Sequence, residues 1–279
     1  MIPGIGTRDH CSGRGAVSSE PRPEFFLLRE LSLLMPAELR LSGEGEHVDS
    51  EHVDTTTPAH HVYPHPYRFM GENDIVGALV GYYEAKLDCF GATARGVDWK
   101  DEASQRKRFD QLVRVLRLDQ HREPFSVVDF GCGYGALRRY LQEQELPFSY
   151  TGYDRSEKMI AAARLMHPEG AFTTDWTVVP DSDFVVATGV FNVRLDLPDD
   201  VWRDHVIQSL EAMASKARVG LAADFLTSHA DADRKRADLY YADPAVIFDW
   251  YMRSVSRWVA LLHDSDLYEF TVAAVRRPW

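Results

Sequence analysis

The stretch from Val127 to Leu137 constrains the fold of this 279-residue chain more than any other stretch does. Its letters, VVDFGCGYGAL, run from β-branched residues through an aspartate to three glycines at alternate positions. An apolar pattern of helical period begins at Leu137 and continues at Tyr140 and Leu141. The pattern predicts a strand, a tight turn and a helix. Glycines allow positive φ and close approach of a ligand, and a helix N-terminus offers unpaired N–H groups. We therefore expect this turn to hold a nucleotide-like molecule.

The glycine spacing alone is compatible with two classes of cofactor. Gly131, Gly133 and Ala136 also fit the G-x-G-x-x-G/A pattern of dinucleotide-binding folds. Asp129 lies two residues before the first glycine and favours S-adenosylmethionine instead. Its carboxylate can receive the ammonium of a methionine moiety, directly or through water, whereas it would repel a pyrophosphate.

Two further strands are each predicted to end in a polar residue that suits the same cofactor. The strand Phe148–Tyr153 is followed by Asp154, whose carboxylate can accept hydrogen bonds from ribose hydroxyls. A short strand at 171–174 is followed by Asp175 and Trp176, an acceptor beside a flat apolar ring. This pair suits the amino group and the face of an adenine.

The run DFGCGYG, Asp154 and the pair Asp175-Trp176 together resemble the cofactor site of the class I, Rossmann-like S-adenosylmethionine-dependent methyltransferases. The resemblance covers roughly residues 82–277. It implies an α/β fold with a seven-stranded, mostly parallel sheet, a C-terminal antiparallel hairpin, helices on both faces and an N-terminal helical cap. The cofactor-binding residues that it implies are Asp129, Gly131, Gly133, Gly135, Asp154, Asp175, Trp176 and Gly189.

Periodic patterns predict the other elements in chain order. Helices occupy the chain from Asp74 to Leu116, on either side of the segment 91–99. Strands are predicted at 183–188, 218–226, 257–263 and 267–275, and helices at 199–215 and from Pro244 to Met252. The last two strands form a hairpin that a plain dinucleotide-binding domain does not need, which supports the methyltransferase interpretation independently of the glycines.

The chain is expected to divide into three parts. Residues 1–67 are rich in Gly, Pro, Ser, His and acids and form a poorly ordered extension, followed by a helical cap at 68–120 and a methyltransferase core at 121–279. The histidines of the extension match no ligand spacing, so we expect no metal site. A start nearer Met70 is a further hypothesis.

The candidates for catalysis follow the fourth and fifth strands, because ligands of doubly wound sheets bind beyond the carboxyl ends of the strands. Asn192 lies in the loop after the fourth strand, with Arg194 as a partner for an acceptor carboxylate. The long polar segment 227–243 is typical of a lid or substrate wall. It contains His229, the first candidate for a general base, and Tyr241 as an orienting residue.

Aromatic residues of the cap have two open interpretations. Trp99, Tyr82 and Tyr83 either face the sulfonium of the cofactor or pack the cap onto the sheet. Phe191, beside Asn192, is likewise a candidate to lie near the transferred methyl.

The predicted function is methyl transfer from S-adenosylmethionine to a small polar metabolite by in-line displacement, with oxygen preferred to nitrogen as the acceptor. The net charge of −12 and the absence of an Asn/Asp-Pro-Pro-Tyr/Phe tetrad argue against nucleic-acid bases. Protein or RNA methylation, an NAD-dependent oxidoreductase and a non-catalytic cofactor-binding module remain alternatives. Because we find neither an apolar run of membrane-spanning length nor a signal peptide, we expect a cytoplasmic protein. The oligomeric state stays open.

Overall fold

The computed structural model of the protein describes residues 72–277, and seven strands of this part form one sheet in the order β3-β2-β1-β4-β5-β7-β6. The strands are β1 Phe125–Phe130, β2 Phe148–Tyr153, β3 Ala171–Thr173, β4 Ser182–Ala187, β5 Ala217–Leu226, β6 Trp258–Leu262 and β7 Glu269–Val275. The helices are α1 Glu72–Phe90, α2 Glu102–Leu116, α3 Ala136–Glu143, α4 Glu157–Met166, α5 Asp199–Lys216 and α6 Pro244–Ser254. The expectations for residues 1–67 and for a start at Met70 lie outside the described residues.

The strand pairing gives a mostly parallel sheet that ends in an antiparallel pair. β1 pairs in parallel with β2 and β4, β2 with β3, and β4 with β5. β7 runs antiparallel to both β5 and β6. The predicted fold class is therefore confirmed, including the closing hairpin.

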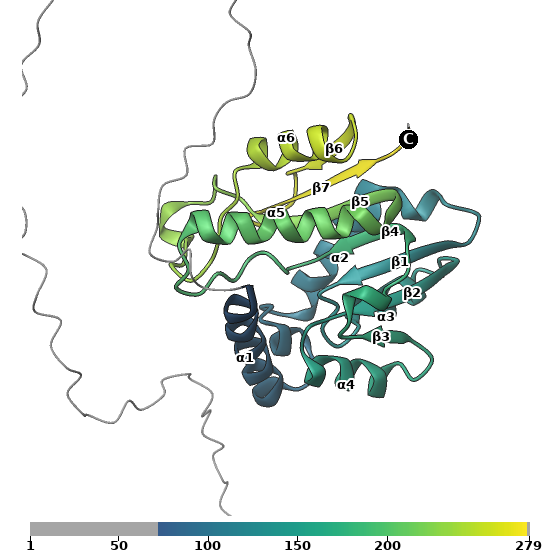
Figure 1. Ribbon diagram of the computed structural model, residues 1–279, viewed down its shortest axis with the longest axis horizontal. Helices are drawn as coiled ribbons and strands as arrows, with labels where there is room; N and C mark the ends of the chain where they lie inside the picture. The colour runs from purple at the N-terminus through teal and green to yellow at the C-terminus, as the bar shows by residue number, and fades with distance from the viewer. Residues whose placement is uncertain (1–71, 278–279) are drawn as a thin grey trace, which may run out of the picture. The chain divides into compact units, whose positions relative to one another are not determined.

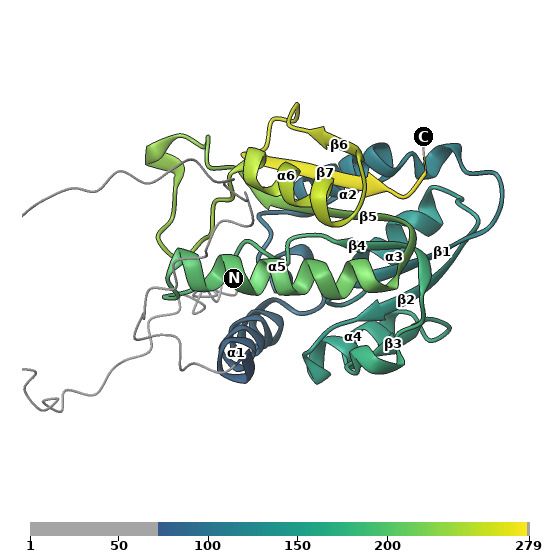
Figure 2. The same ribbon diagram turned by 45° about the horizontal axis from the view of Figure 1, so that its top comes forward.

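Helices cover both faces of the sheet, as a parallel sheet requires (Figures 1 and 2). Successive strand residues point to opposite faces. Val127 packs in the core that contains residues of α2 and α3, and Val128 packs in the core that contains residues of α5 and α6. α2 is thus a helix of the sheet layer, held at its N-terminus by a capping box between Asp101 and Ser104.

α1 lies near the carboxyl end of β1 (Figure 1). Polar contacts fasten it to the start of α4: Ser156 donates a hydrogen bond from its hydroxyl to Glu84 over 2.8 Å, and Lys158 pairs with Asp88 at 2.9 Å. These contacts hold α1 near the carboxyl end of β1, over the start of α4.

Among the helices within residues 72–277, none combines the length and the apolar character that a membrane crossing needs.

Trp202 on α5 offers a test of the core. Its side chain is fully buried, and its indole N–H donates to the carbonyl of Phe191 over 2.9 Å. We expect Trp202→Ala to lower the free energy of unfolding by about 3–5 kcal/mol. Trp202→Phe keeps most of the volume but removes the donor, so it should cost about 1–3 kcal/mol.

Urea denaturation followed by circular dichroism would measure both losses. Leu165→Ala is the matched control, because that side chain is 84% exposed and its removal should change stability little. A Trp202→Phe variant as stable as the wild type would show that the hydrogen bond contributes nothing.

Candidate functional site

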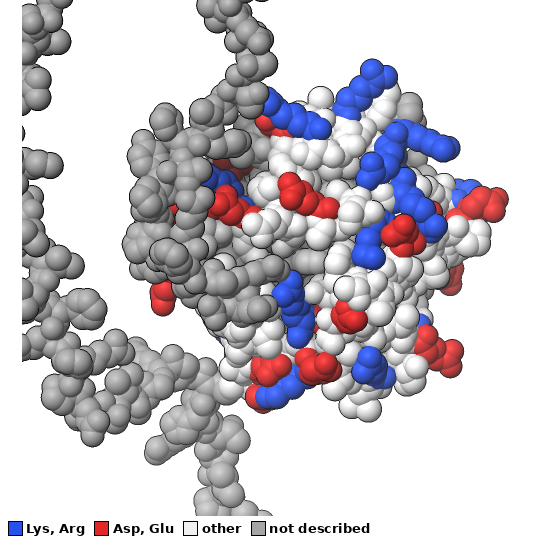
Figure 3. All heavy atoms as spheres, viewed as in Figure 1, with Lys and Arg blue, Asp and Glu red and all other residues white. Residues whose placement is uncertain are grey.

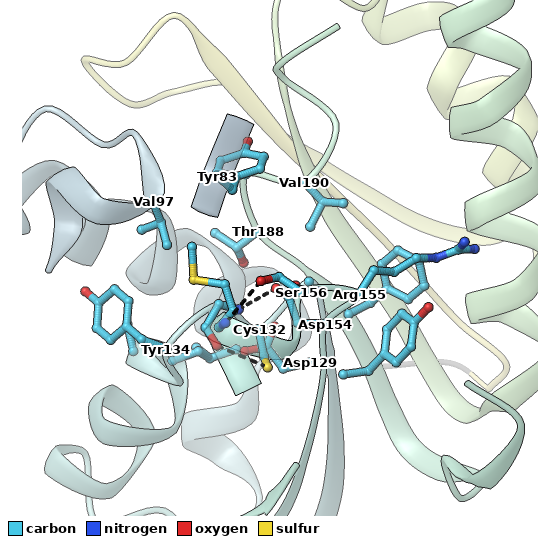
Figure 4. A pocket seen from close by; sticks show the side chains of 18 of the residues that line it. Tyr83, Val97, Asp129, Cys132, Tyr134, Asp154, Arg155, Ser156, Thr188 and Val190 are labelled. Atoms are coloured by element: carbon cyan, nitrogen blue, oxygen red, sulfur yellow. Dashed lines mark hydrogen bonds between the residues drawn. The ribbon is translucent and has the colours of Figure 1, made fainter. Parts of the chain in front are cut away.

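A cavity lies at the carboxyl ends of β1, β2 and β4 (Figure 4). Its wall is formed by α1, the turn after β1, the start of α4 and the loop after β4. Tyr83 and Thr188 lie on one side of the space in Figure 4, and Asp154 and Cys132 lie on the other. The cavity therefore sits where the sequence placed a ligand.

The turn after β1 has the backbone conformation that its glycines permit. Gly131, Gly133 and Gly135 have φ values of 76°, 53° and 82°. A Cβ on Gly131 would lie 2.5 Å from Val190 Cγ2, so this position has no room for a side chain. A Cβ on Gly135 would lie 2.8 Å from the ring of His167. Glycine at this position is therefore needed for the packing of His167 against the turn.

Asp154 ties the glycine turn to the start of α4. Its Oδ2 accepts the N–H of Gly133 and its Oδ1 accepts the N–H of Ser156, each over 2.9 Å. Burial raises the pKa of the Asp154 carboxyl above its ordinary value, against the effect of these hydrogen bonds. Asp154 therefore holds the backbone and also lines the cavity.

Asp129 at the floor of the cavity is 4% exposed. The hydroxyl of Tyr150 donates to its Oδ2 over 2.6 Å. Burial raises the pKa of Asp129 to about 7, although the hydrogen bond from Tyr150 acts in the opposite direction. A cation that reached this carboxylate would favour its ionised form.

Gly189, in the loop after β4, is held by a hydrogen bond to Asp224 and by close packing against Trp99. Its N–H donates to Asp224 Oδ1 over 2.7 Å, and a Cβ at this position would lie 2.1 Å from Trp99 Cζ2. The Arg108 guanidinium lies over the Trp99 ring, 3.8 Å from the centroid. This arrangement supports the packing interpretation of Trp99, since a cation of the protein already occupies the ring.

A second cavity adjoins the first. Both are lined by the four residues Tyr83, Val97, Trp99 and Gly189. The second cavity extends over the segment 95–100, the loop after β4 and the segment that follows β5. The two cavities therefore meet at these residues, and ligands bound in them would be neighbours.

The predicted cofactor residues Asp175 and Trp176 do not line either cavity. Asp175 accepts the N–H and the hydroxyl of Thr177 and so caps a short 3-10 helix, Trp176–Val178. Trp176 packs edge-on against Phe130 and Tyr153, which do line the first cavity. Their assigned role in adenine binding stays a prediction.

The three catalytic candidates are dispersed. Asn192 is buried and lines the second cavity, where its Oδ1 accepts the N–H of Leu226 over 3.2 Å. His229 lies beside His263 and lines neither cavity. Tyr241 also lies outside both, with its hydroxyl accepting the N–H of Arg236.

Arg194 and Phe191, close to Asn192 in the sequence, contact other parts of the protein. Arg194 pairs with Asp199 at 3.0 Å and donates to main-chain carbonyls, including that of Leu239. Arg194 lines neither cavity, and its predicted pairing with an acceptor carboxylate stays a prediction. Phe191 is 1% exposed, stacks on Phe225 in the core and lines neither cavity.

Several cavity residues were not anticipated from the sequence. They include the apolar face of α1 in the first cavity, and Arg95, Lys100 and Arg108 in the second. The available signal was the pair of cations that flank Trp99 in the short segment between two helices.

The contact between Gly189 and Trp99 can be tested by a double-mutant cycle. Gly189→Ala should destabilise the protein by more than the roughly 1–2 kcal/mol of a left-handed backbone, because the new Cβ meets the indole ring. In a Trp99→Ala background the cost of Gly189→Ala should fall toward that backbone value. Unfolding free energies of the four variants measure this, and strictly additive effects would contradict the contact.

Comparisons with known proteins agree with this geometry. Residues 101–268 match the model of a methyltransferase domain family. The chain is 43% identical over 161 residues to a Mycobacterium tuberculosis protein named as a methyltransferase, Rv1506c, and the match covers 56% of this chain and 96% of that protein.

A second relative is the trans-aconitate 2-methyltransferase of Mycolicibacterium gilvum, 30% identical over 178 residues. That match covers 62% of this chain and 58% of the relative, so the chain spans less than two thirds of its length. Among solved structures, magnesium protoporphyrin IX methyltransferase from Synechocystis PCC 6803 with bound S-adenosylmethionine aligns with 20% identity and a TM-score of 0.47, over 63% of this chain and 81% of that one. Because the family match alone spans more than half of the sequence, the chain belongs to the class I S-adenosylmethionine-dependent methyltransferases.

Proposed function

We propose that this methyltransferase transfers the methyl group of S-adenosylmethionine to a small polar metabolite, with an oxygen as the accepting atom. The observation that carries the proposal is the pair of adjoining cavities, which share Tyr83, Trp99 and Gly189 in one wall. The first cavity would hold the cofactor and the second the acceptor. An arrangement of this kind brings two reactants together and can contribute up to roughly 7–11 kcal/mol to lowering the barrier.

The residues of the first cavity fit the cofactor. The glycine turn offers main chain without side chains, and Thr188 Oγ1 is a buried polar atom without a hydrogen-bond partner in the described structure. In the proposal Asp129 binds the ammonium of the methionine moiety. Each oxygen of Asp154 accepts one backbone N–H and has a further lone pair, which would accept a ribose hydroxyl. Gly131, Gly133 and Gly189 allow the main chain to lie close to the ligand.

When bound, the cofactor supplies an activated methyl group on a positively charged sulfur. The work left to the protein is to align the acceptor behind that methyl and to keep water out. Tyr83 and Trp99 line both cavities, so their rings are placed to keep water out. The amide oxygen of Asn192 is engaged by Leu226, so its NH₂ group is the part that can donate to an acceptor.

The relatives named trans-aconitate 2-methyltransferase support a small-molecule acceptor, although their names describe those proteins and not this one. Figure 3 shows Lys and Arg side chains gathered in the upper right part of the face that it draws, with Asp and Glu elsewhere on that face. The net charge of −12 favours a small molecule over RNA. A cytoplasmic location stays a prediction from the sequence.

Titration calorimetry with S-adenosylhomocysteine and, separately, with NAD tests the cofactor site. We expect micromolar binding of the former and none of the latter. Asp154→Ala should weaken the binding by about 1.5–3 kcal/mol, because it removes a charged hydrogen-bond acceptor. Unchanged affinity in that variant would remove Asp154 from the site, and binding of NAD alone would refute the proposal.

The affinity for S-adenosylhomocysteine should also depend on pH through Asp129. Burial holds the pKa of this carboxyl at about 7 in the free protein, so the carboxylate that the ammonium needs is scarce at pH 6 and abundant at pH 7.5. Affinity should therefore rise about tenfold over that interval.

Calorimetry at several pH values would measure this slope. In Asp129→Asn the affinity should be lower and nearly independent of pH. A flat profile in the wild type would mean that Asp129 does not receive the ammonium.

A further inference from the structure

The second cavity carries an unusual set of charges for a chain with a net charge of −12. Five cationic residues line it, against the two carboxylates Asp98 and Glu269. The cations are Lys86, Arg95, Lys100, Arg108 and Arg236. A locally positive cavity in an acidic protein attracts anions of small size.

Three of these cations are neutralised by acids of the protein. Arg108 pairs with Glu269, Lys86 pairs with Asp98 at 2.7 Å, and Arg236 pairs with Asp238 at 2.5 Å. These pairs build the wall and leave little charge for a ligand.

Arg95 and Lys100 are different. Within residues 72–277 neither forms an ion pair with an acid, and the Arg95 guanidinium lies over the ring of Phe90, 4.1 Å from its centroid. Both belong to the segment 91–100, which we term the cationic loop. The excess positive charge of the second cavity thus comes from one short segment.

The cationic loop is held in a defined shape. A Cβ on Gly96 would lie 2.0 Å from the carbonyl oxygen of Gly91, so the loop closes on itself too tightly for any other residue. Asp98 adopts a left-handed conformation, with φ at 61°, and accepts the hydroxyl of Tyr82 over 2.6 Å. Because α1 holds the loop in this way, the backbone that carries the exposed side chains of Arg95 and Lys100 has a defined shape before a ligand arrives.

Two buried polar atoms provide a second observation. Arg108 Nε and Glu269 Oε2 belong to residues that line the cavity, and neither has a hydrogen-bond partner in the described structure. The two side chains are only 10% and 5% exposed. Buried polar atoms generally find partners, and the Arg108 Nε–H is a donor that an anionic ligand can accept, whereas Glu269 Oε2 is an acceptor and calls for a donor.

We propose that the second cavity binds an organic carboxylate as the methyl acceptor, with Arg95 and Lys100 as the residues that select it. The inference rests on the proposed function and names its substrate class. The apolar side chains of Phe90, Leu226 and Leu239 in the same wall suit the carbon skeleton of an organic acid.

The chemistry of a carboxylate also fits the residues present. One carboxylate oxygen attacks the methyl carbon, and the carbon–sulfur bond breaks with its electron pair remaining on sulfur. The products are a methyl ester and S-adenosylhomocysteine, and no proton is transferred. The reaction therefore needs no general base, in agreement with a cavity that no histidine lines and whose two carboxylates are each paired with a cation.

Binding can be measured without turnover. The full chain, saturated with S-adenosylhomocysteine, is titrated with succinate, with citrate and with the neutral analogue succinamide. We expect at least one of the acids to bind, more weakly at high salt, and succinamide not to bind. Failure of both acids to bind overturns the inference.

Arg95→Gln and Lys100→Gln should each weaken binding of the acid about tenfold, while the affinity for S-adenosylhomocysteine stays within twofold of the wild type. Arg122→Gln is the matched control, because Arg122 is an exposed arginine just before the amino end of β1, whereas the first cavity lies at the carboxyl ends of the strands and the second adjoins it. Wild-type affinity for the acid in both loop variants would overturn the assignment. A parallel loss of cofactor affinity would do so too, since it would place the two residues in the cofactor site.

Turnover separates the two proposals. With radiolabelled methyl on S-adenosylmethionine, a panel of di- and tricarboxylic acids should yield products that release labelled methanol in alkali, as methyl esters do. Label on neutral acceptors alone would refute the carboxylate and leave the proposed function standing. Failure of S-adenosylhomocysteine to bind would refute the proposed function itself.

Discussion

A column of packed side chains between the two cavities determines how the site is built. Asp224 at its base accepts the N–H of Gly189, the Trp99 ring lies close against Gly189, and the Arg108 guanidinium covers that ring and pairs with Glu269. The column joins β5, the loop after β4, the cationic loop, α2 and β7. Movement of any of these members would change the residues that line both cavities.

The column places two carboxyl groups in the core. Burial, and then the negative charge of Glu269, raises the pKa of Asp224 to about 7, and burial raises the pKa of Glu269 despite its partner Arg108. Both groups therefore lower stability as the pH rises, because a raised pKa favours the protonated form of the folded state. This loss begins near the ordinary carboxyl pKa and, for Asp224, is complete above about pH 7. The single cation Arg108 between them limits the cost.

The parts of the structure that follow from local sequence were predictable. The glycine turn, the strand before it and Asp154 lie in continuous or neighbouring segments, and backbone sterics at three glycines restrict them strongly. The sheet order follows from the same family pattern, and the closing hairpin from alternation in the last two strands. Asp129 and Asp154 consequently lie on the cavity where the sequence placed them.

The second cavity could not be predicted from local sequence, because its lining residues come from segments that are far apart in the chain. Lys86, Arg108 and Arg236 approach one another only through the fold, and their pairing with acids decides which cations stay available. Position in the chain suggested His229 and Tyr241, but the segment after β5 turns its Arg236 and Leu239 toward the cavity instead. The contacts of Arg194 with Asp199 and with main-chain carbonyls were also not evident from its place in the sequence, because they form only in the folded chain.

In this protein the net charge and the charge inside the second cavity bear on ligands of different size. The overall charge of −12 disfavours long polyanions, whose many phosphates would meet repulsion beyond the cavity. A small anion is affected mainly by charges within about a Debye length of 8–10 Å, and inside the second cavity those charges are dominated by the cationic loop. Under the proposal, the net charge disfavours nucleic acid, while the second cavity concentrates a small organic acid next to the cofactor.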